Sequence, residues 1–288
     1  MDHRTLKQFV NLAESLHFGR AAEASNVSPS ALSRGIRRLE EELGAALFER
    51  NNRSVSLTHA GELFLAWARD NLGGWDAIRN SLMAESAELH GEVSIYCSVT
   101  ASYSFLFDIL ARVRQKHPRI EIKLHTGDPE DAVHRVLSGS EDIAIAARPP
   151  RLQAGLAFNL IDVSPLVFIA SKESPMPTHP GPRHWADCPM ILSERGLARQ
   201  RVDRWFRKIG VIPRIYAQVA GNEAIVSMVS LGFGVGVVPR IVLDNSPLAE
   251  RVQIVDVQPG LAPYEVGLVT QEKKLANPLI SAFWQALE

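Results

Sequence analysis

The sequence predicts a chain of mixed class: a helical N-terminal domain, one long helix and a larger α/β part. Residues 4–43 repeat apolar side chains at intervals of three and four, as amphipathic helices do. Residues 59–87 carry the same period over a much longer stretch. From Gly91 onward, short β-branched runs alternate with helical stretches, which is typical of a parallel sheet with helices on its faces.

The N-terminal domain, residues 1–58, reads as three helices and a hairpin. "RTLKQFVNLAES" and "GRAAEAS" predict two helices, and "NVS" predicts the tight turn after them. Ser28 suits an N-cap and Pro29 the first position of a third helix, whose apolar stripe includes Leu32, Ile36 and Leu39. "LFERNNRSVSLT" predicts two short strands around a turn, so the domain is a winged helix-turn-helix.

The exposed side of the third helix carries small hydroxyls and guanidinium groups toward its N-terminal half. Such groups bind phosphates and base edges when the second helix of a helix-turn-helix enters the major groove. A solvated face balanced by Glu40, Glu41 and Glu42 is the alternative, but these acids come later in the helix. The predicted DNA contacts are Ser28, Ser30, Ser33, Arg34, Arg37 and Arg38, with Arg50, Asn52 and Arg53 of the wing over a neighbouring phosphate backbone.

Residues 59–90 form the predicted linker helix. Trp67, Trp75, Ile78 and Leu82 follow its period and lie on one face. An apolar face of that length needs a partner helix, so we expect this segment to pair two subunits.

Residues 91–288 form the predicted two-lobed part. Strands and helices alternate from "GEVSIYCSV" to "EDIAIAAR" and again from "RQRVDRWFRKIG" to "VGVVPR". The chain is expected to cross between lobes near 160–167 and to return near Pro263. This gives lobe I as 91–162 with 264–288, and lobe II as 163–263.

Composition and motifs exclude several classes. The formal net charge is −1, so any contact with nucleic acid must be local. A polar start and the lack of a long apolar run predict a cytoplasmic protein without a membrane partner. Cys97 and Cys188 are expected to be free thiols. No His or Cys pair has metal-ligand spacing, and no nucleophile elbow occurs, so neither a metal nor a catalytic site is predicted.

The glycines at 232, 234 and 236 resemble a dinucleotide loop only superficially. Their spacing is G-x-G-x-G, and a helix precedes them where the dinucleotide motif needs one to follow. The sequence therefore predicts no cofactor. An enzyme such as a dehydrogenase, and an exported solute-binding protein, remain the rival classes.

Residues 6–61, "LKQFVNLAESLHFGRAAEASNVSPSALSRGIRRLEEELGAALFERNNRSVSLTHAG", closely resemble the N-terminal signature of LysR-type transcriptional regulators. The resemblance implies a DNA-binding regulator with a linker helix and a two-lobed effector domain like the type II periplasmic binding proteins. It also implies operator DNA and RNA polymerase as partners, and assembly as a dimer of dimers.

Later stretches, among them "CSVTASYS", "EIKLHTGD" and "GNEAIVSMVSLGFGVGVVP", are similar to one member of that family in particular. That member activates the gene for acetohydroxy acid isomeroreductase in isoleucine and valine biosynthesis. The similarity implies a small 2-acetohydroxy acid effector, acetolactate or acetohydroxybutyrate. A different small carboxylate, or a response to redox state, stays open as the alternative.

The effector site is expected where strand "CSVT" ends and a helix begins at Ala101. A helix N-terminus attracts a carboxylate, and strand ends of α/β sheets are the usual ligand sites. Thr100 as a mere helix cap is the structural alternative, and Arg148 is nearly as well explained as a surface arginine. The predicted effector residues are Ser98, Thr100, Ala101, Ser102, Thr126 and Arg148 from lobe I, with Phe168, Arg195, Asn222 and Glu223 from lobe II.

Overall fold

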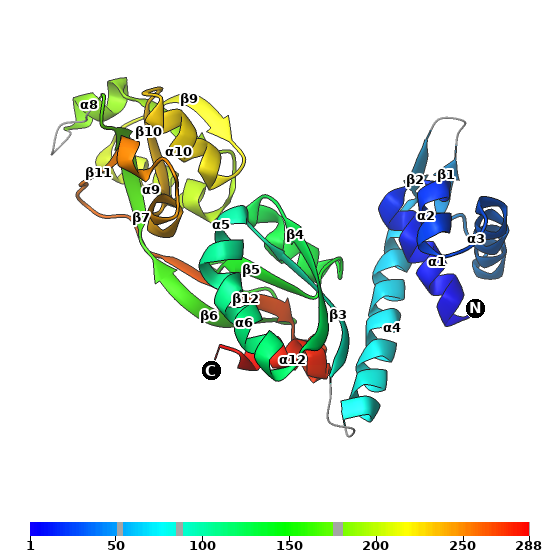
Figure 1. The fold of residues 1–288 in the computed structure, drawn as a ribbon. Coiled ribbons are helices and arrows are strands. Elements are labelled where there is room, and N and C mark those ends of the chain that lie inside the picture. The colour runs from blue at the N-terminus through cyan, green and yellow to red at the C-terminus, as the bar shows by residue number, and fades with distance from the viewer. Residues whose placement is uncertain (51–53, 85–88, 175–180, 288) are drawn as a thin grey trace. The chain divides into compact units, whose positions relative to one another are not determined.

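The computed structural model describes residues 1–50, 54–84, 89–174 and 181–287 (Figure 1). The chain folds into two compact units, one holding residues 1–87 with 138–140 and the other holding 88–137 and 141–288. The predicted winged helix-turn-helix, linker helix and two α/β lobes are confirmed.

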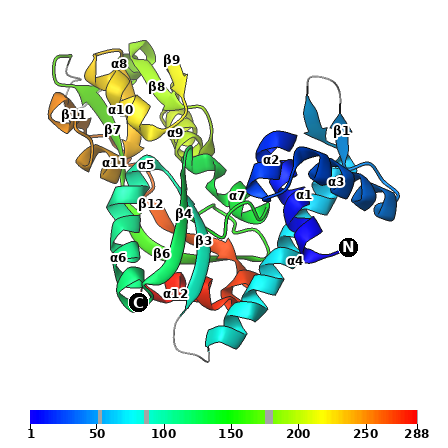
Figure 2. The ribbon, with the colours of Figure 1, turned by 45° about the vertical axis from the view of Figure 1, so that its right-hand side comes forward.

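The N-terminal unit contains three short helices, a hairpin and one long helix. Its elements are α1 (His3–Ser15), α2 (Phe18–Ala24), α3 (Pro29–Leu43), β1 (Phe48–Arg50), β2 (Val55–Leu57) and α4 (His59–Ala84). Figure 2 shows the antiparallel hairpin beside α2 and α3. Phe9, Leu12, Leu32 and Ile36 are fully buried, so the apolar stripes of α1 and α3 meet in one core.

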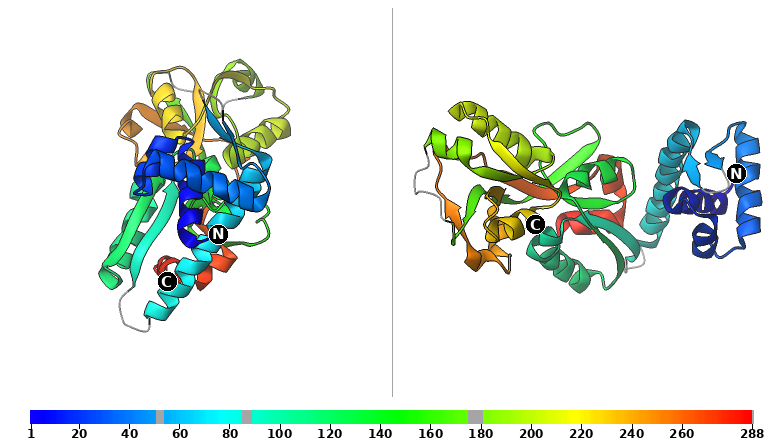
Figure 3. Two further views of the ribbon diagram at one scale, coloured as in Figure 1. Left: turned by 90° about the vertical axis from the view of Figure 1, so that its right-hand side faces the viewer. Right: turned by 90° about the horizontal axis from the view of Figure 1, so that it is seen from above.

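Helix α4 is joined to the hairpin through its first turn. The Thr58 hydroxyl donates to the Ala46 carbonyl at 2.7 Å and accepts from the Gly61 N–H at 2.9 Å, which caps the helix. A Cβ on Gly61 would overlap the Leu47 carbonyl, so only glycine allows this close approach. The helix continues without a break through Gly73 and Gly74 (Figure 3).

Lobe I is a five-stranded sheet in the order β4-β3-β5-β12-β6. Its strands are β3 (His90–Cys97), β4 (Arg119–Thr126), β5 (Ile143–Ala147), β6 (Leu156–Ser164) and β12 (Tyr264–Gln271). Its helices are α5 (Val99–Ala101), a π-helical turn (Ser102–Leu106), α6 (Phe107–Lys116), a 3-10 turn (Pro129–Asp131), α7 (Ala132–Leu137), a 3-10 turn (Glu272–Ala276) and α12 (Pro278–Gln285).

Side chains alternate across this sheet. Ile95 and Ile143 face the core with α6 and α12, whereas Tyr96 and Ala144 face the core with α7. The expectation of a parallel sheet is corrected here, because the sheet is mixed. β3 pairs with β4 and β5 in parallel, but β12 pairs with β5 and β6 antiparallel, because β6 and β12 are the strands that leave for and return from lobe II.

Lobe II repeats the plan with the order β11-β7-β10-β8-β9. Its elements are β7 (Leu166–Ser171), α8 (Pro182–Asp187), β8 (Pro189–Ser193), α9 (Gly196–Ile209), β9 (Arg214–Val219), α10 (Asn222–Ser230), β10 (Val235–Pro239), α11 (Arg240–Asp244), a 3-10 turn (Ala249–Arg251) and β11 (Val252–Val255). Helices α8 and α9 cover one face of the sheet, and α10 and α11 cover the other. β7 pairs antiparallel with β10 and β11, a second departure from the parallel expectation.

The chain passes from β6 into β7 at Pro165 and returns between β11 and β12, so two crossings link the lobes (Figure 1). The ends of β3 and β5 in lobe I lie near the starts of α10 and α11 in lobe II. None of the helices in the described ranges combines the length and the apolar character that crossing a lipid bilayer needs.

Candidate functional site

The first candidate site is the exposed face of α3. Ser28 caps the helix, because its hydroxyl accepts from the Ala31 N–H at 3.2 Å, and it also lies 3.1 Å from the Ser30 hydroxyl. Leu32, Ile36 and Leu39 are buried on the opposite side. The face presents Ser28, Ser30, Arg34, Arg37 and Arg38 as exposed residues, with Ser33 half-buried beside them.

The arginines of this face differ in their partners. Arg37 pairs with Glu41 one turn later at 3.2 Å, and both side chains are largely exposed. Within the described residues, Arg34 and Arg38 form no ion pair, so their guanidinium groups stand ready for an anion or a base edge.

Arg50 is held by the protein itself. Its guanidinium donates to Glu40 at 2.7 Å and lies 5.2 Å above the Phe18 ring. The other Glu40 oxygen accepts the backbone N–H groups of Leu47 and Phe48 at 2.9 and 3.1 Å. Arg50 therefore stabilises the domain through Glu40 and Phe18, a role that the sequence did not indicate. The two other predicted wing contacts, Asn52 and Arg53, lie outside the described residues.

The second candidate site is the cleft between the lobes, at the helix that follows β3. This helix begins at Val99, two residues earlier than expected, and α5, the π-helical turn and α6 run on to Lys116. Its N-cap is Ser98, whose hydroxyl accepts the Ala101 N–H at 3.2 Å. The amide of Ala101 is therefore occupied within the helix, and the view of Thr100 as the cap is corrected. Ser102 also bonds locally, donating its hydroxyl to the Val99 carbonyl at 2.7 Å.

Thr100 instead faces a carboxylate. It is 3% exposed, and both its backbone N–H and its hydroxyl donate to the same oxygen of Glu223, at 3.1 and 2.5 Å. Glu223 lies in the first turn of α10 in lobe II. Two donors that converge on one oxygen form an anion-binding site, and here the anion comes from the other lobe.

A small cavity of about 40 Å³ adjoins this contact. Ser98, Thr100 and Asn222 supply its polar edge, and Ala101 lines it beside them. Its apolar wall includes Phe105, Ile145, Ile241 and Val242, none of which was predicted. For Ile241 and Val242 the reason is that "VGVVPRIV" does not show by itself that a cleft-lining helix follows the strand. A site with one anion-binding corner and an apolar wall suits a small branched acid.

A second set of contacts joins the lobes at the start of α9. The Arg195 guanidinium donates to Asp131 at 2.6 Å and to Asp128 at 3.2 Å. Glu130 lies against the first turn of α9 and accepts the Leu197 N–H. Burial, and then the charge of Asp128, raise the pKa of Glu130 to about 7. Arg195 thus binds the protein's own carboxylates, and the sequence pattern does not indicate these acidic partners.

The cavity lining does not include Ser102 or Arg195, whose local contacts are given above, and Glu223 adjoins it only through Thr100. Three further predicted effector residues lie away from it. Thr126 is exposed at the end of β4. Arg148 pairs with Glu265 at 3.1 Å and covers the Phe158 ring, which fits the surface-arginine alternative. Phe168 is a correction: its side chain is fully buried between Trp185 and Trp205, with ring centroids 4.9 and 4.8 Å away, so it cannot touch a ligand.

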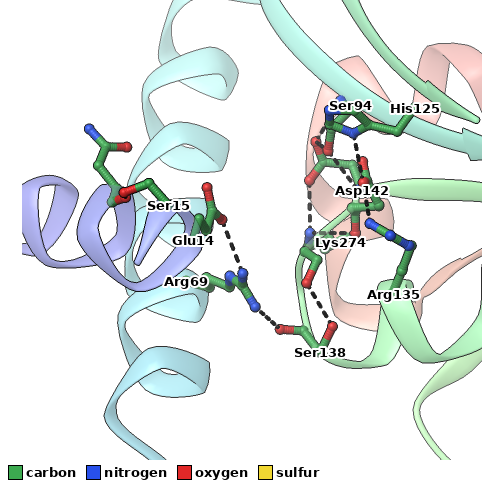
Figure 4. A network of polar contacts seen from close by, with 12 residues as sticks. Glu14, Ser15, Arg69, Ser94, His125, Arg135, Ser138, Asp142 and Lys274 are labelled. Carbon is green, nitrogen blue, oxygen red and sulfur yellow. Dashed lines mark hydrogen bonds and ion pairs between the residues drawn. The ribbon is translucent and has the colours of Figure 1, made fainter. Parts of the chain in front are cut away.

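The base of lobe I is fixed by a polar network away from the cleft (Figure 4). Asp142 accepts from Lys274 at 2.7 Å and from the N–H and hydroxyl of Ser94 at 3.0 and 2.9 Å. These partners lower the pKa of Asp142 against the effect of its burial. The network ties β3, β5 and the segment after β12 together, so it holds the strand that leads into Thr100.

The thiols are buried in separate lobes. Cys97 ends β3, Cys188 precedes β8, and both are free. Burial raises the pKa of Cys97 to about 12 and raises that of Cys188 as well. Neither is held as a reactive thiolate.

Comparison with known proteins assigns both units. Residues 3–62 match the bacterial regulatory helix-turn-helix protein of the lysR family, and residues 86–288 match the LysR substrate binding domain. Among solved structures, a full-length OxyR variant from Pseudomonas aeruginosa is similar with a TM-score of 0.74 at 22% identity, covering 100% of this chain and 94% of that one. The LysR family regulator CbnR in complex with its target DNA has a TM-score of 0.66 at 23% identity, with 100% and 99% covered. These likenesses show the fold.

Sequence relatives are nearer. The chain is 45% identical to the HTH-type transcriptional activator IlvY of Salmonella typhimurium and to the regulator IlvY of Escherichia coli K12, over 100% of this chain and 99% of each relative. It is 40% identical to the activator IlvY of Haemophilus influenzae over the full length of both. The two matched domains cover nearly the whole sequence, and the chain belongs to the LysR family of DNA-binding transcriptional regulators, which are not enzymes.

Proposed function

We propose that this protein is an effector-dependent activator of the gene for acetohydroxy acid isomeroreductase, induced by acetolactate or acetohydroxybutyrate. The observation that carries the proposal is the full-length identity of 45% with IlvY activators. The cleft supports the chemistry. Thr100 offers two donors to a carboxylate, and Ile145, Ile241 and Val242 line the neighbouring wall where a short alkyl group fits.

Operator recognition is proposed for α3 and the wing. Arg34 and Ser30 read base edges or adjacent phosphates, Arg38 extends the contact, and the wing lies over the backbone. The exposed positions of these residues on α3 support the assignment. An activator of this kind binds chromosomal DNA, so the protein acts in the cytoplasm. It activates transcription by RNA polymerase.

Assembly as a dimer of dimers is proposed through α4. Trp75, Ile78 and Leu82 are 57, 61 and 73% exposed along one side of the helix, and Trp67 is 43% exposed on the same side. So much apolar surface on one helix favours pairing with a second copy. Two recognition helices then reach paired half-sites, as helix-turn-helix dimers require.

A response to redox state is the less supported alternative. Cys97 and Cys188 are buried in different lobes, and burial raises the pKa of both thiols, whereas redox sensors need accessible thiolates. A different small carboxylate would use the same Thr100 corner.

The test joins binding and transcription. Purified protein is titrated by calorimetry with acetolactate, acetohydroxybutyrate, pyruvate and 2-ketoisovalerate, and the same acids are supplied to a reporter fused to the isomeroreductase promoter. The proposal expects the two acetohydroxy acids to bind and to induce. Induction by pyruvate or 2-ketoisovalerate alone, or no binding of the promoter, would refute it.

A further inference from the structure

The two donors of Thr100 are already occupied by the protein's own anion. The N–H and hydroxyl of Thr100 define what we call the Thr100 seat, and one oxygen of Glu223 fills it. Thr100 belongs to lobe I and Glu223 to lobe II, so the contact bridges the cleft. Glu223 comes 123 positions later in the chain, which makes the bridge a tertiary contact and not a local cap.

The position of Glu223 is electrostatically favourable on both sides. The seat lies at the start of the helical stretch from Val99 to Lys116, and Glu223 is the second residue of α10. Each helix start carries a partial positive charge and unpaired N–H groups. A carboxylate between the first turns of these two helices neutralises part of the positive charge of each, as the carboxylate of a bound acid would.

The cavity beside the seat cannot hold the proposed effector while Glu223 is in place. Its volume of about 40 Å³ has room for a few water molecules at most. A five-carbon acid whose carboxylate takes the Thr100 donors needs that corner emptied first. The effector's carboxylate and that of Glu223 would also repel each other if both lay beside the Thr100 donors.

We propose that Glu223 is a built-in stand-in for the effector carboxylate. In the effector-free protein it occupies the Thr100 seat and holds the lobes together across the cleft. The effector's carboxylate displaces it, so induction exchanges an internal anion for an external one and releases lobe II from that bridge. This inference rests on the proposed binding of the acid at Thr100.

If the effector and Glu223 compete for the Thr100 seat, substitutions at the two residues should affect effector binding non-additively. Removing the Thr100 hydroxyl weakens the effector, but it also weakens the internal competitor. When Glu223 is present, the loss of effector affinity caused by Thr100→Val is therefore smaller than the hydroxyl's full contribution to effector binding. Once Glu223 is made neutral, the same Thr100 change should cost more. Independent contacts would give equal factors in both backgrounds.

The experiment is a calorimetric double-mutant cycle with acetolactate on the full-length protein. Its variants are Glu223→Gln, Thr100→Val and the double variant, with Glu250→Gln as the matched control because that carboxylate is 98% exposed on lobe II. Glutamine keeps the shape but replaces a charge-assisted bond by a weaker neutral one. We expect Glu223→Gln to bind acetolactate about tenfold more tightly than wild type. Glu250→Gln should match wild type, and Thr100→Val should cost a larger factor in the Glu223→Gln background.

Hydrogen exchange at the Thr100 amide tests the bridge without any effector. Faster exchange in Glu223→Gln than in wild type is expected, because its hydrogen bond is weakened. Unchanged exchange, or unchanged or weaker acetolactate binding in Glu223→Gln, would overturn this inference. If Thr100→Val leaves acetolactate binding unchanged in both the wild-type and the Glu223→Gln backgrounds, or if wild type does not bind acetolactate, the proposed effector site itself is wrong, and the stand-in falls with it.

Discussion

Glu40 and Arg50 form an ion pair of 2.7 Å that fastens strand β1 to helix α3. The same carboxylate accepts two backbone N–H groups where the chain enters the hairpin. One side chain near the end of α3 thus joins this helix to the start of the hairpin.

Glu40→Gln should therefore lower both stability and DNA binding. The side chain is only 16% exposed, and losing a charge-assisted network of this kind typically costs about 1–3 kcal/mol. Thermal unfolding and a gel shift on specific and unrelated DNA check it, with weaker binding expected for both. Glu41→Gln, which breaks an exposed pair, should change little. Equal behaviour of the two variants would remove the fastening role of Glu40.

Arg34→Ala should reduce specific operator binding by about 1–3 kcal/mol, because a bidentate guanidinium contact to a base is lost. Arg204→Ala, an exposed arginine of α9 in the effector domain, is the matched control and should leave binding unchanged. Footprinting over a range of protein concentrations measures both. Protection by Arg34→Ala at wild-type concentrations would take Arg34 out of the interface.

Trp75→Asp should disrupt pairing through α4. The tryptophan is 57% exposed, so the substitution costs the monomer little, but it places a charge in the proposed apolar seam. Sedimentation velocity should show smaller particles, and binding to paired half-sites should fall. Gly73→Asp adds the same charge about 200° around the helix, where a side chain meets no neighbour. If both variants sediment as wild type does, the seam is not the interface.

Glu130 should make stability depend on pH. Its pKa is raised from 4.5 to about 7 in the folded protein, so between these values the native state holds a proton that the unfolded state has lost. Unfolding free energy therefore falls as pH rises from about 4.5 to about 7 and is not lowered further by this group above that.

Glu130→Gln stays neutral throughout and should lose that part of the decline. The melting temperature of the variant minus that of wild type should therefore be a few degrees higher at pH 8 than at pH 5. Thermal scans across this range, with Glu250→Gln as control, test the claim. A constant difference between variant and wild type at every pH would show that Glu130 does not titrate there.

Periodicity predicted the helices well because each buries one stripe. The stripe of α3 and the cap at Ser28 needed no tertiary information. Strand direction was harder. β12 and β7 are antiparallel to neighbours because the chain crosses between lobes, and no residue pattern in "PYEVGLVTQ" encodes which strand it will meet.

The candidate site was predicted in part. Ser98, Thr100, Asn222 and Glu223 meet at the cleft, as strand and helix ends suggested. The hydrogen-bonding role of each of these residues could not be predicted from the sequence. Ser98 caps the helix, a role that the structural alternative gave to Thr100, and Glu223 is the partner of Thr100. Phe168 lies on β7, and its side chain packs against α8 and α9, so it is buried in the core. The contact between Thr100 and Glu223 joins residues 123 positions apart, which a local sequence pattern cannot show.

The most direct test of the central claim, that an acid bound at Thr100 controls transcription, is Thr100→Val in a promoter fusion with and without acetolactate, beside a gel shift on the same protein. Valine keeps the shape of a side chain that is 3% exposed and removes only its hydroxyl. We predict operator binding like wild type, about tenfold weaker acetolactate binding, and loss of induction at concentrations that saturate wild type. Full induction at those concentrations would contradict the account, and joint loss of DNA binding and induction would show that Thr100 only holds the fold.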